Sequence, residues 1–163
     1  MQKKAFPDAN ALSGARTGRE REENGMERKT VRVAAAAVIR DGRVLLCRRG
    51  YGELKGFWEF PGGKCEPGET ARETAVREIM EELKIRIVPG ELLCRVVYDY
   101  PLFRLDMDVF TAYLPEGEPV ATEHEGILWA DMADLERLKF CPADVQAAEK
   151  LKAFPGFAGG QTR

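Results

Sequence analysis

The sequence contains few of the residues that build zinc sites and disulfide frameworks. Its 163 residues include one histidine, His124, and four cysteines, none of which stand in a CxxC pair. Structural zinc sites use closely spaced Cys and His ligands, and small disulfide-rich domains carry dense cysteines. Both classes are therefore excluded, and the scattered cysteines favour a reducing cytoplasm. Any metal site must be built mainly from oxygen ligands, which favours Mg²⁺ or Mn²⁺.

The sequence also lacks a long apolar run and a strong charge of one sign. No stretch approaches the roughly 20 apolar residues that a membrane-spanning helix needs, and the N-terminus has no apolar signal-peptide centre. The formal net charge is -2, with no dense Lys/Arg cluster beyond the N-terminal stretch. We therefore expect no membrane partner and no nucleic-acid polymer. A small anionic ligand held by a few placed groups is compatible with this composition.

The length and composition predict one domain with a proper core, since 44% of the residues are hydrophobic. Residues 1–29 are polar, charged and without periodicity, which predicts a flexible tail. Met26, just before the first predicted strand, favours an upstream start-site artefact as the origin of this tail. The domain is expected over residues 30–157, followed by a frayed C-terminus over 158–163.

Hydrophobic periodicity predicts a mixed α/β fold. The segment 31–40 reads as a buried strand, and the turn "DGR" (41–43) joins it to a second strand in a hairpin. A short strand from residue 57 is expected to end in a glycine loop at Gly62-Gly63-Lys64. Further strands are predicted at 84–88, 91–99, 106–114 and 126–130, and helices at 69–83, 132–138 and 142–154, the last with Pro142 in its first turn. These elements predict a mixed sheet between layers of helices.

The helix predicted over 69–83 carries an unusual crowd of acids. Its buried side is marked by apolar residues at helical intervals, and Glu78, Glu81 and Glu82 share a face roughly opposite that side. Like charges at this spacing destabilise a helix by about 0.2–0.5 kcal/mol per pair. A solvated acidic face is the ordinary explanation of such a pattern.

The residues before the helix favour a different explanation. A glycine-rich turn lets backbone N–H groups approach phosphate oxygens, and Lys64 follows the two glycines directly. Glu69 lies where the helix begins. Divalent cations would offset the repulsion among these carboxylates and bridge them to the phosphates of a substrate.

The same residues resemble the Nudix box, in which a glycine, an acid and an Arg-Glu-aliphatic-x-Glu-Glu helix stand at fixed spacing. The matching positions are Gly63, Glu69, Arg77, Glu78, Ile79, Glu81, Glu82 and Ile85. The motif's last glycine is replaced by Lys84, which we expect in a left-handed conformation at a cost of about 1 kcal/mol. The segments "LLCRR", "WEFPGGK" and 123–145 resemble MutT-type members, especially the CTP pyrophosphohydrolase branch.

The resemblance spans about residues 31–154 and implies a Nudix α/β/α sandwich that uses Mg²⁺ to hydrolyse nucleoside triphosphates. It implies metal contacts at Gly63, Glu69, Glu78, Glu81, Glu82 and Glu123. Catalytic roles are implied for Arg77, Glu78, Glu81, Glu82 and Glu123, with Arg77 orienting the glutamates and Glu78 a candidate base. Glu69 is also suited to a helix N-terminus by charge alone.

Substrate contacts are implied at Arg49, Phe60, Gly62, Gly63, Lys64 and Asp144. Arg49 matches a phosphate-binding arginine, although Arg48 could equally point inward, because side chains alternate along a strand. Asp144 matches a position that reads the base, where a carboxylate accepts hydrogen bonds from an amine or ring N–H. Its place in a first helical turn also explains an acid there. His124 is interpreted as a surface or packing residue.

Three functions stay open from the sequence. The favoured one is conversion of (deoxy)nucleoside triphosphates, of the 8-oxo-dGTP or CTP/dCTP type, to monophosphate and pyrophosphate. A second is hydrolysis of ADP-ribose or another nucleoside diphosphate derivative, to which Pro101 points weakly. A third is a nucleotide-binding module without turnover. The protein is expected to act on a small-molecule nucleotide as a monomer or homodimer.

Overall fold

The computed structural model describes residues 28–158. Its strands are β1 (Lys29–Arg40), β2 (Arg43–Arg48), β3 (Trp58–Glu59), β4 (Gly62–Lys64), β5 (Val88–Asp99), β6 (Phe103–Tyr113) and β7 (Gly126–Ala130). Its helices are α2 (Ala71–Leu83), α3 (Met132–Arg137), α4 (Asp144–Lys152) and α5 (Pro155–Ala158). One mixed sheet runs in the order β3-β2-β1-β6-β5, with β4 added to β1 and β7 to β2.

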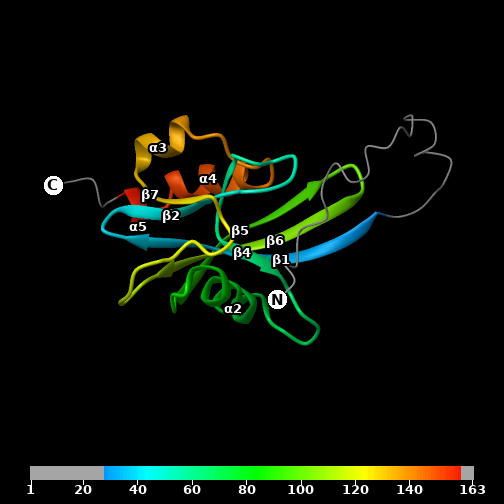
Figure 1. The fold of residues 1–163 in the computed structure, drawn as a ribbon, viewed down its shortest axis with the longest axis horizontal. Helices are drawn as coiled ribbons and strands as arrows, with labels where there is room; N and C mark the ends of the chain where they lie inside the picture. Colours follow the sequence, from blue (N-terminus) through cyan, green and yellow to red (C-terminus); the bar gives the residue numbers. More distant parts are fainter. Residues whose placement is uncertain (1–27, 159–163) are drawn as a thin grey trace.

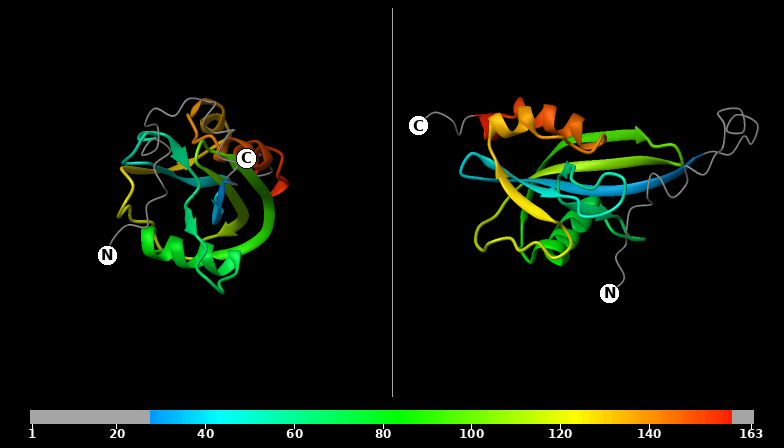
Figure 2. Two further views of the ribbon diagram at one scale, coloured as in Figure 1. Left: turned by 90° about the vertical axis from the view of Figure 1, so that its right-hand side faces the viewer. Right: turned by 45° about the horizontal axis from the view of Figure 1, so that its top comes forward.

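Helices cover both faces of this sheet. Figure 1 shows α2 on one face and α3, α4 and α5 on the other, and the second view of Figure 2 shows the same layers. One core lies between the sheet and α4, where Ala147, Ala148 and Leu151 are buried, and a second lies under α2, where Ile79 and Leu83 are buried. The predicted α/β/α sandwich is confirmed.

Strand β1 is central because it is apolar on both faces. Residues 33–38 are all buried, and four of them are alanines whose small side chains allow close packing above and below. β1 runs parallel to β6 over the whole register from Lys29–Phe103 to Ile39–Tyr113. A near-continuous apolar run is the expected pattern for a strand paired in parallel and covered on both faces.

The predicted hairpin between the first two strands is confirmed. Asp41 and Gly42 form a two-residue turn, and both have positive φ angles, of 52° and 73°. This conformation matches the right-handed twist of the flanking strands, and an Asp-Gly pair adopts it readily. Arg40 faces Arg43 across the turn, which fixes the register of β2.

The structure corrects three predicted elements. Residues 62–64 form strand β4 against β1, and a Cβ at Gly62 would lie 2.2 Å from the Ala34 carbonyl oxygen, so this glycine allows the two backbones to approach. Residues 84–87 form no strand, because Ile85 and Ile87 are buried by packing under the sheet without ladder partners. Residues 155–158 lie beyond the last predicted helix, and residue 158 belongs to the predicted frayed terminus, yet they form α5 and Phe157 is buried in the core.

The ends of the domain differ slightly from the expected boundaries. Lys29 begins β1, so the predicted tail overlaps the first strand by this one residue, while residues 1–27, Met26 among them, lie outside the described residues. Ala158 ends α5, and residues 159–163 also lie outside that range. Within residues 28–158, the helices lack the length and apolar content needed to cross a lipid bilayer.

Candidate active site

The acidic helix α2 begins at a capping box. The backbone N–H of Glu73 donates to the Thr70 hydroxyl at 3.2 Å, and the Thr70 N–H donates to the Glu73 carboxylate at 2.8 Å. These two bonds satisfy backbone groups that a helix start otherwise leaves open. They set the point at which the helix begins, and thereby the direction in which each later glutamate projects.

Arg77 contacts three of the acids, Glu69, Glu78 and Glu81. Its Nε and Nη2 donate to the two carboxylate oxygens of Glu69 at 2.7 and 2.9 Å, and its Nη1 donates to Glu78 at 2.8 Å and Glu81 at 3.4 Å. Its Nη2 also donates to the backbone carbonyl of Lys64 at 3.0 Å. The guanidinium therefore ties helix α2 to strand β4 and fixes two of the box glutamates.

Glu69 is built into this arrangement as a partner of Arg77. It also accepts a hydrogen bond from the Thr74 hydroxyl at 2.6 Å and one from the Glu66 N–H at 3.2 Å. The hydrogen bonds from Arg77, with smaller ones from Thr74 and Glu66, lower the pKa of Glu69 to about 2. The ion pair with Glu69 likewise raises the pKa of Arg77.

Gly63 makes room for Glu78. A Cβ on Gly63 would lie 2.4 Å from Cδ of Glu78, so only a glycine lets this carboxylate lie against β4. Glu78 is 7% exposed. The predicted acidic face opposite the apolar side is therefore wrong in detail, because Glu78 is buried and only Glu81 of the three acids is exposed.

Glu82 is an acid whose charged form is strongly disfavoured by its surroundings. Its Oε2 atom is buried and has no hydrogen-bond partner among the described residues. Burial, followed by the charges of Glu78, Glu59, Glu123 and Glu81, raises the pKa of Glu82 to about 9. A buried carboxylate oxygen that lacks a donor and faces other carboxylates is suited to a divalent cation. The donor set therefore fits Mg²⁺ or Mn²⁺ by its chemistry.

A loop before β7 brings Glu123 to the same place. The Thr122 hydroxyl and N–H donate to the Glu82 carbonyl at 2.7 and 3.3 Å, and the Val120 N–H donates to the Leu83 carbonyl at 2.9 Å. The last carbonyls of a helix have no partners within it, and this loop supplies donors to them. Glu123 itself is exposed, at the end of α2 where Glu82 lies.

A pocket opens on the other side of the sheet. Its walls include Arg49, Phe60, Gly62 and Asp144. Its floor is apolar, formed by side chains of β1 and β6 such as Val33, Leu105 and Met107. Of the two arginines that end β2, Arg49 is buried in this wall, whereas Arg48 is exposed and pairs with Glu125 at 3.0 Å.

Asp144 forms the polar end of this pocket. Its Oδ1 accepts a hydrogen bond of 2.9 Å from the Phe60 N–H, and the Phe60 ring stacks on Phe140 at 6.1 Å. Burial and the nearby charge of Glu59 raise the pKa of Asp144 well above its usual range. Pro142 and Ala143 precede this residue, which is the first of α4 rather than the third helical residue of the predicted segment.

The predicted site residues thus form two adjoining groups. Helix α2 and the loop before β7 collect Glu69, Arg77, Glu78, Glu81, Glu82 and Glu123, with Gly63 and Lys64 on β4. The pocket collects Arg49, Phe60, Gly62 and Asp144. Pro101, in contrast, lies in the tight turn between β5 and β6, where the Tyr100 N–H donates to the Phe103 carbonyl.

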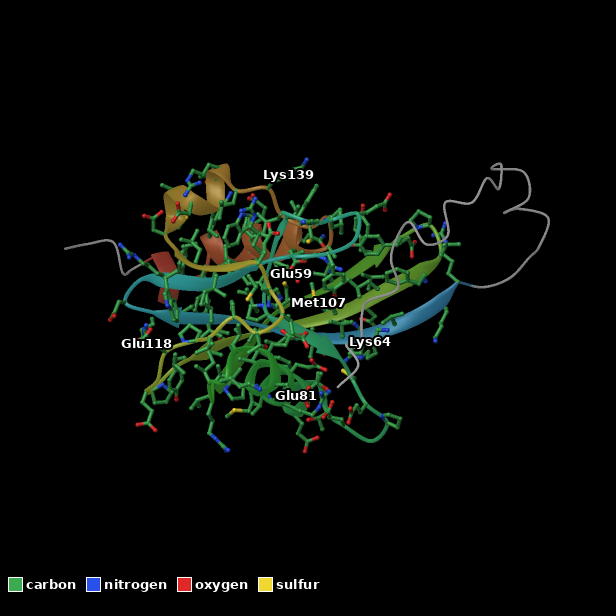
Figure 3. All side chains as sticks on the ribbon, viewed as in Figure 1. Glu59, Lys64, Glu81, Met107, Glu118 and Lys139 are labelled. Carbon is green, nitrogen blue, oxygen red and sulfur yellow. The ribbon has the colours of Figure 1, made fainter. Side chains whose placement is uncertain are left out.

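Sequence reasoning missed Glu59, and His124, predicted as a surface or packing residue, has a largely buried side chain. Glu59 lies on β3 between the two groups, and Figure 3 shows it near the middle of the molecule, with Glu81 on α2 below. It contacts Arg49 and His124, both at 3.3 Å. An acid between two aromatic residues gave no local signal that it faces a pocket, because its partners come from distant segments.

Comparison with known proteins identifies the family of this chain. A model of the NUDIX domain matches residues 34–150. The chain belongs to the Nudix family. Among curated Nudix relatives, it is 32% identical to the CTP pyrophosphohydrolase of Escherichia coli (strain K12) over 128 residues, 77% of this chain and 93% of that protein.

Two further relatives support the assignment to this family. A putative 8-oxo-dGTP diphosphatase 2 of Mycobacterium tuberculosis (strain ATCC 25618 / H37Rv) is 36% identical over 114 residues, 69% of this chain and 81% of that protein. The crystal structure of a MutT NUDIX hydrolase from Burkholderia pseudomallei superimposes with a TM-score of 0.68 at 32% identity, covering 76% of this chain and 98% of that one. These matches support the family and the fold of this chain.

Proposed function

We propose that this Nudix hydrolase converts (deoxy)nucleoside triphosphates to the monophosphate and pyrophosphate. The observation that carries the proposal is the buried Oε2 of Glu82, which has no partner among the described residues and lies among further carboxylates, beside a pocket lined by Arg49 and Asp144. Proteins similar to this chain are named for CTP and for 8-oxo-dGTP, so nucleotides of these two types are the substrates to test first.

A divalent cation, Mg²⁺ or Mn²⁺, would be held by Glu78, Glu81, Glu82 and Glu123, with the backbone at Gly63 as a further contact. When bound, such a cation neutralises phosphate charge and lowers the pKa of a coordinated water. We assign Glu69 a different task from the metal contact expected at first. Its carboxylate pairs with Arg77 through both oxygens, so it acts on the metal site by fixing Arg77.

The chain's own residues supply orientation and proton transfer. Arg77 holds Glu78 and Glu81 in fixed positions, which lowers the entropy cost of assembling the site. Glu78, held against β4 by Arg77 and the space at Gly63, is our candidate for the general base. Lys64 on β4 and Arg49 in the pocket wall are proposed phosphate contacts, and Gly62, also in that wall, allows the close approach of β4 to β1.

The pocket offers two acids to a base. Asp144 and Glu59 lie together at its polar end, and the raised pKa of Asp144 favours a carboxyl group that can donate as well as accept. Cytosine presents an amine donor beside a ring acceptor, and 8-oxoguanine presents several N–H donors. Both base types therefore match this pair, with Phe60 contributing to the wall.

The test is a panel of nucleotides assayed for pyrophosphate release. The purified protein, with Mg²⁺, is offered CTP, dCTP, 8-oxo-dGTP, the four ordinary dNTPs and ADP-ribose. Inorganic pyrophosphatase and phosphate detection measure the pyrophosphate released from triphosphates, and HPLC measures the nucleoside monophosphate formed from every substrate, including ADP-ribose, which releases no pyrophosphate. Turnover of a triphosphate to its monophosphate supports the proposal. Turnover of ADP-ribose alone would favour the second function, and no turnover at all would favour a binding module.

Two further expectations belong with this proposal. A cytoplasmic location fits the free thiols of all four cysteines, because disulfides are rare in a reducing compartment. Monomer and homodimer both stay open as states of assembly, and light scattering coupled to gel filtration distinguishes them.

A further inference from the structure

The one histidine of the chain is buried beside the pocket. His124 lies in the loop before β7, and its side chain is 9% exposed. Its Nε2 lies 3.3 Å from Oε1 of Glu59, while its Nδ1 is buried and makes no hydrogen bond within residues 28–158. The contact with Glu59 is therefore the anchor that orients the imidazole in this part of the structure.

Glu59 is held on both of its oxygens. Its Oε2 lies 3.3 Å from Nη1 of Arg49 and accepts a weak hydrogen bond of 3.9 Å from the Cys141 thiol, while its Oε1 faces His124. Potential ligand atoms of Glu59, Cys141 and Asp144 all lie within 4.8 Å of one another. The direction of the Glu59 carboxylate therefore decides which acceptor atoms the pocket offers beside Asp144.

A glutamate in this place needs a donor on each oxygen. The side chain has three rotatable bonds, and the carboxylates of Asp144 and Glu82 repel it from two sides. Arg49 and the Cys141 thiol both contact Oε2, so a donor at Oε1 would limit rotation of the carboxylate around those contacts. The structure places Nε2 of His124 3.3 Å from Oε1, and an N–H on this nitrogen would be the donor there, since a carboxylate only accepts hydrogen bonds.

We infer that His124 is a positioning residue that sets base specificity by holding Oε1 of Glu59 in the pocket. The inference rests on the proposed nucleotide hydrolysis. His124 also joins the two halves of the site, because its loop carries Glu123 and is fastened to α2 through Thr122. Binding of a base against Glu59 and placement of Glu123 beside the metal ligands are thereby linked through adjacent residues of one loop.

Four variants test this role in the full-length protein. His124→Leu keeps an apolar side chain of moderate size but removes the donor, whereas His124→Gln keeps an N–H at a comparable reach. Glu59→Gln changes the other partner. Glu125→Gln is the matched control, because Glu125 lies in the same loop but pairs with Arg48 at the surface.

The expected result is a change in KM and in base preference, with kcat retained. For His124→Leu we expect KM for the preferred triphosphate to rise about tenfold, as for loss of one hydrogen bond to a charged group, with kcat within about threefold. The ratio of kcat/KM between the preferred and a disfavoured base should fall by a similar factor. His124→Gln should restore both quantities to within about threefold, and Glu125→Gln should match the unaltered protein. Unchanged KM and unchanged base preference in His124→Leu would overturn the inference.

A second measurement separates this inference from the proposed function. Urea unfolding of His124→Leu, Glu59→Gln and the double variant measures the coupling between the two side chains. Non-additive changes in unfolding free energy are expected, and additive changes would contradict the contact even if the enzyme is active. Failure of the unaltered protein to hydrolyse any triphosphate would contradict the proposed function, and the cycle would still decide whether His124 holds Glu59.

Discussion

The carboxylate of Glu82 is buried close to other acids, and this surrounding disfavours its negative charge. A carboxylate oxygen buried without a donor is disfavoured by a few kcal/mol in an apolar environment, and here other acids add repulsion. The pKa of Glu82, raised to about 9, expresses this cost. Perturbed acids of this kind cluster at functional sites, because the bound state supplies the missing partner.

Replacing Glu82 by Gln removes a proposed metal ligand while keeping the shape of the side chain. We expect the rate of nucleotide hydrolysis to fall about 10²–10³-fold, as for loss of a group that stabilises transition-state charge. Steady-state assays of pyrophosphate release measure the change. The metal-free variant should unfold in urea at least as late as the unaltered protein, and full activity would contradict the assignment of Glu82.

Lys84 bears a backbone conformation that favours glycine. It caps α2 with φ 57° and ψ 32°, in the left-handed region, and its N–H donates to the Met80 carbonyl. Lys84→Gly should stabilise the fold by about 1 kcal/mol, because glycine pays no Cβ penalty there. Urea unfolding checks the value, and a less stable glycine variant would show that the Lys84 side chain contributes more than its backbone costs.

The Arg77–Glu69 pair predicts how stability depends on pH. The pKa of Glu69 in the folded protein is about 2, below its unfolded value, so the pair stabilises the fold above that unfolded value and is lost as pH falls towards about 2. We expect Glu69→Gln to lower the unfolding free energy at neutral pH. Urea unfolding from neutral pH downwards should show the two proteins converging. A difference that is independent of pH would contradict the ion pair.

At the level of secondary structure, the packing of α2 against β4 requires the absence of a side chain at Gly63. An added Cβ would meet the Glu78 carboxylate at 2.4 Å, so either the strand or the glutamate must move. We expect Gly63→Ala to cost about 1–3 kcal/mol of unfolding free energy and to reduce activity at least about tenfold. Calorimetric unfolding and the pyrophosphate assay measure both effects.

Gly126 provides the control for that substitution. It lies in β7, and a Cβ there would meet no atom within 4 Å. Gly126→Ala should therefore keep both stability and activity near those of the unaltered protein. Equal losses in the two alanine variants would show that the close approach of Gly63 and Glu78 has no special role.

Elements that depend on neighbouring residues could be predicted from the sequence, and those that depend on distant contacts could not. The Asp-Gly turn and the helix of the Nudix box carry their own local signals, and both formed as expected. The segment 84–87 has a strand-like alternation, yet its isoleucines are buried beneath the sheet without strand pairing. The Gly62-Gly63 segment was misjudged as a loop, because its strand pairing depends on the alanines of β1.

Across the entire chain, the site lies where segments remote in sequence meet. Helix α2, the loop before β7, the end of β2, strand β3 and the start of α4 each contribute one part of it. The box acids could be predicted as a group because they share one helix. The contact between Glu59 and His124 could not be predicted, because nothing in either local sequence indicates that β3 and the loop before β7 come together.

The central claim is that the carboxylates of α2 bind a divalent cation next to the nucleotide pocket. The most direct test is titration of the protein with Mn²⁺, in which binding is measured by calorimetry or by the paramagnetic resonance signal of the free ion. We predict saturable binding that is strengthened by a nucleotide and weakened at least about tenfold in Glu82→Gln. No affinity for Mn²⁺, or an affinity that Glu82→Gln leaves unchanged, would contradict the account.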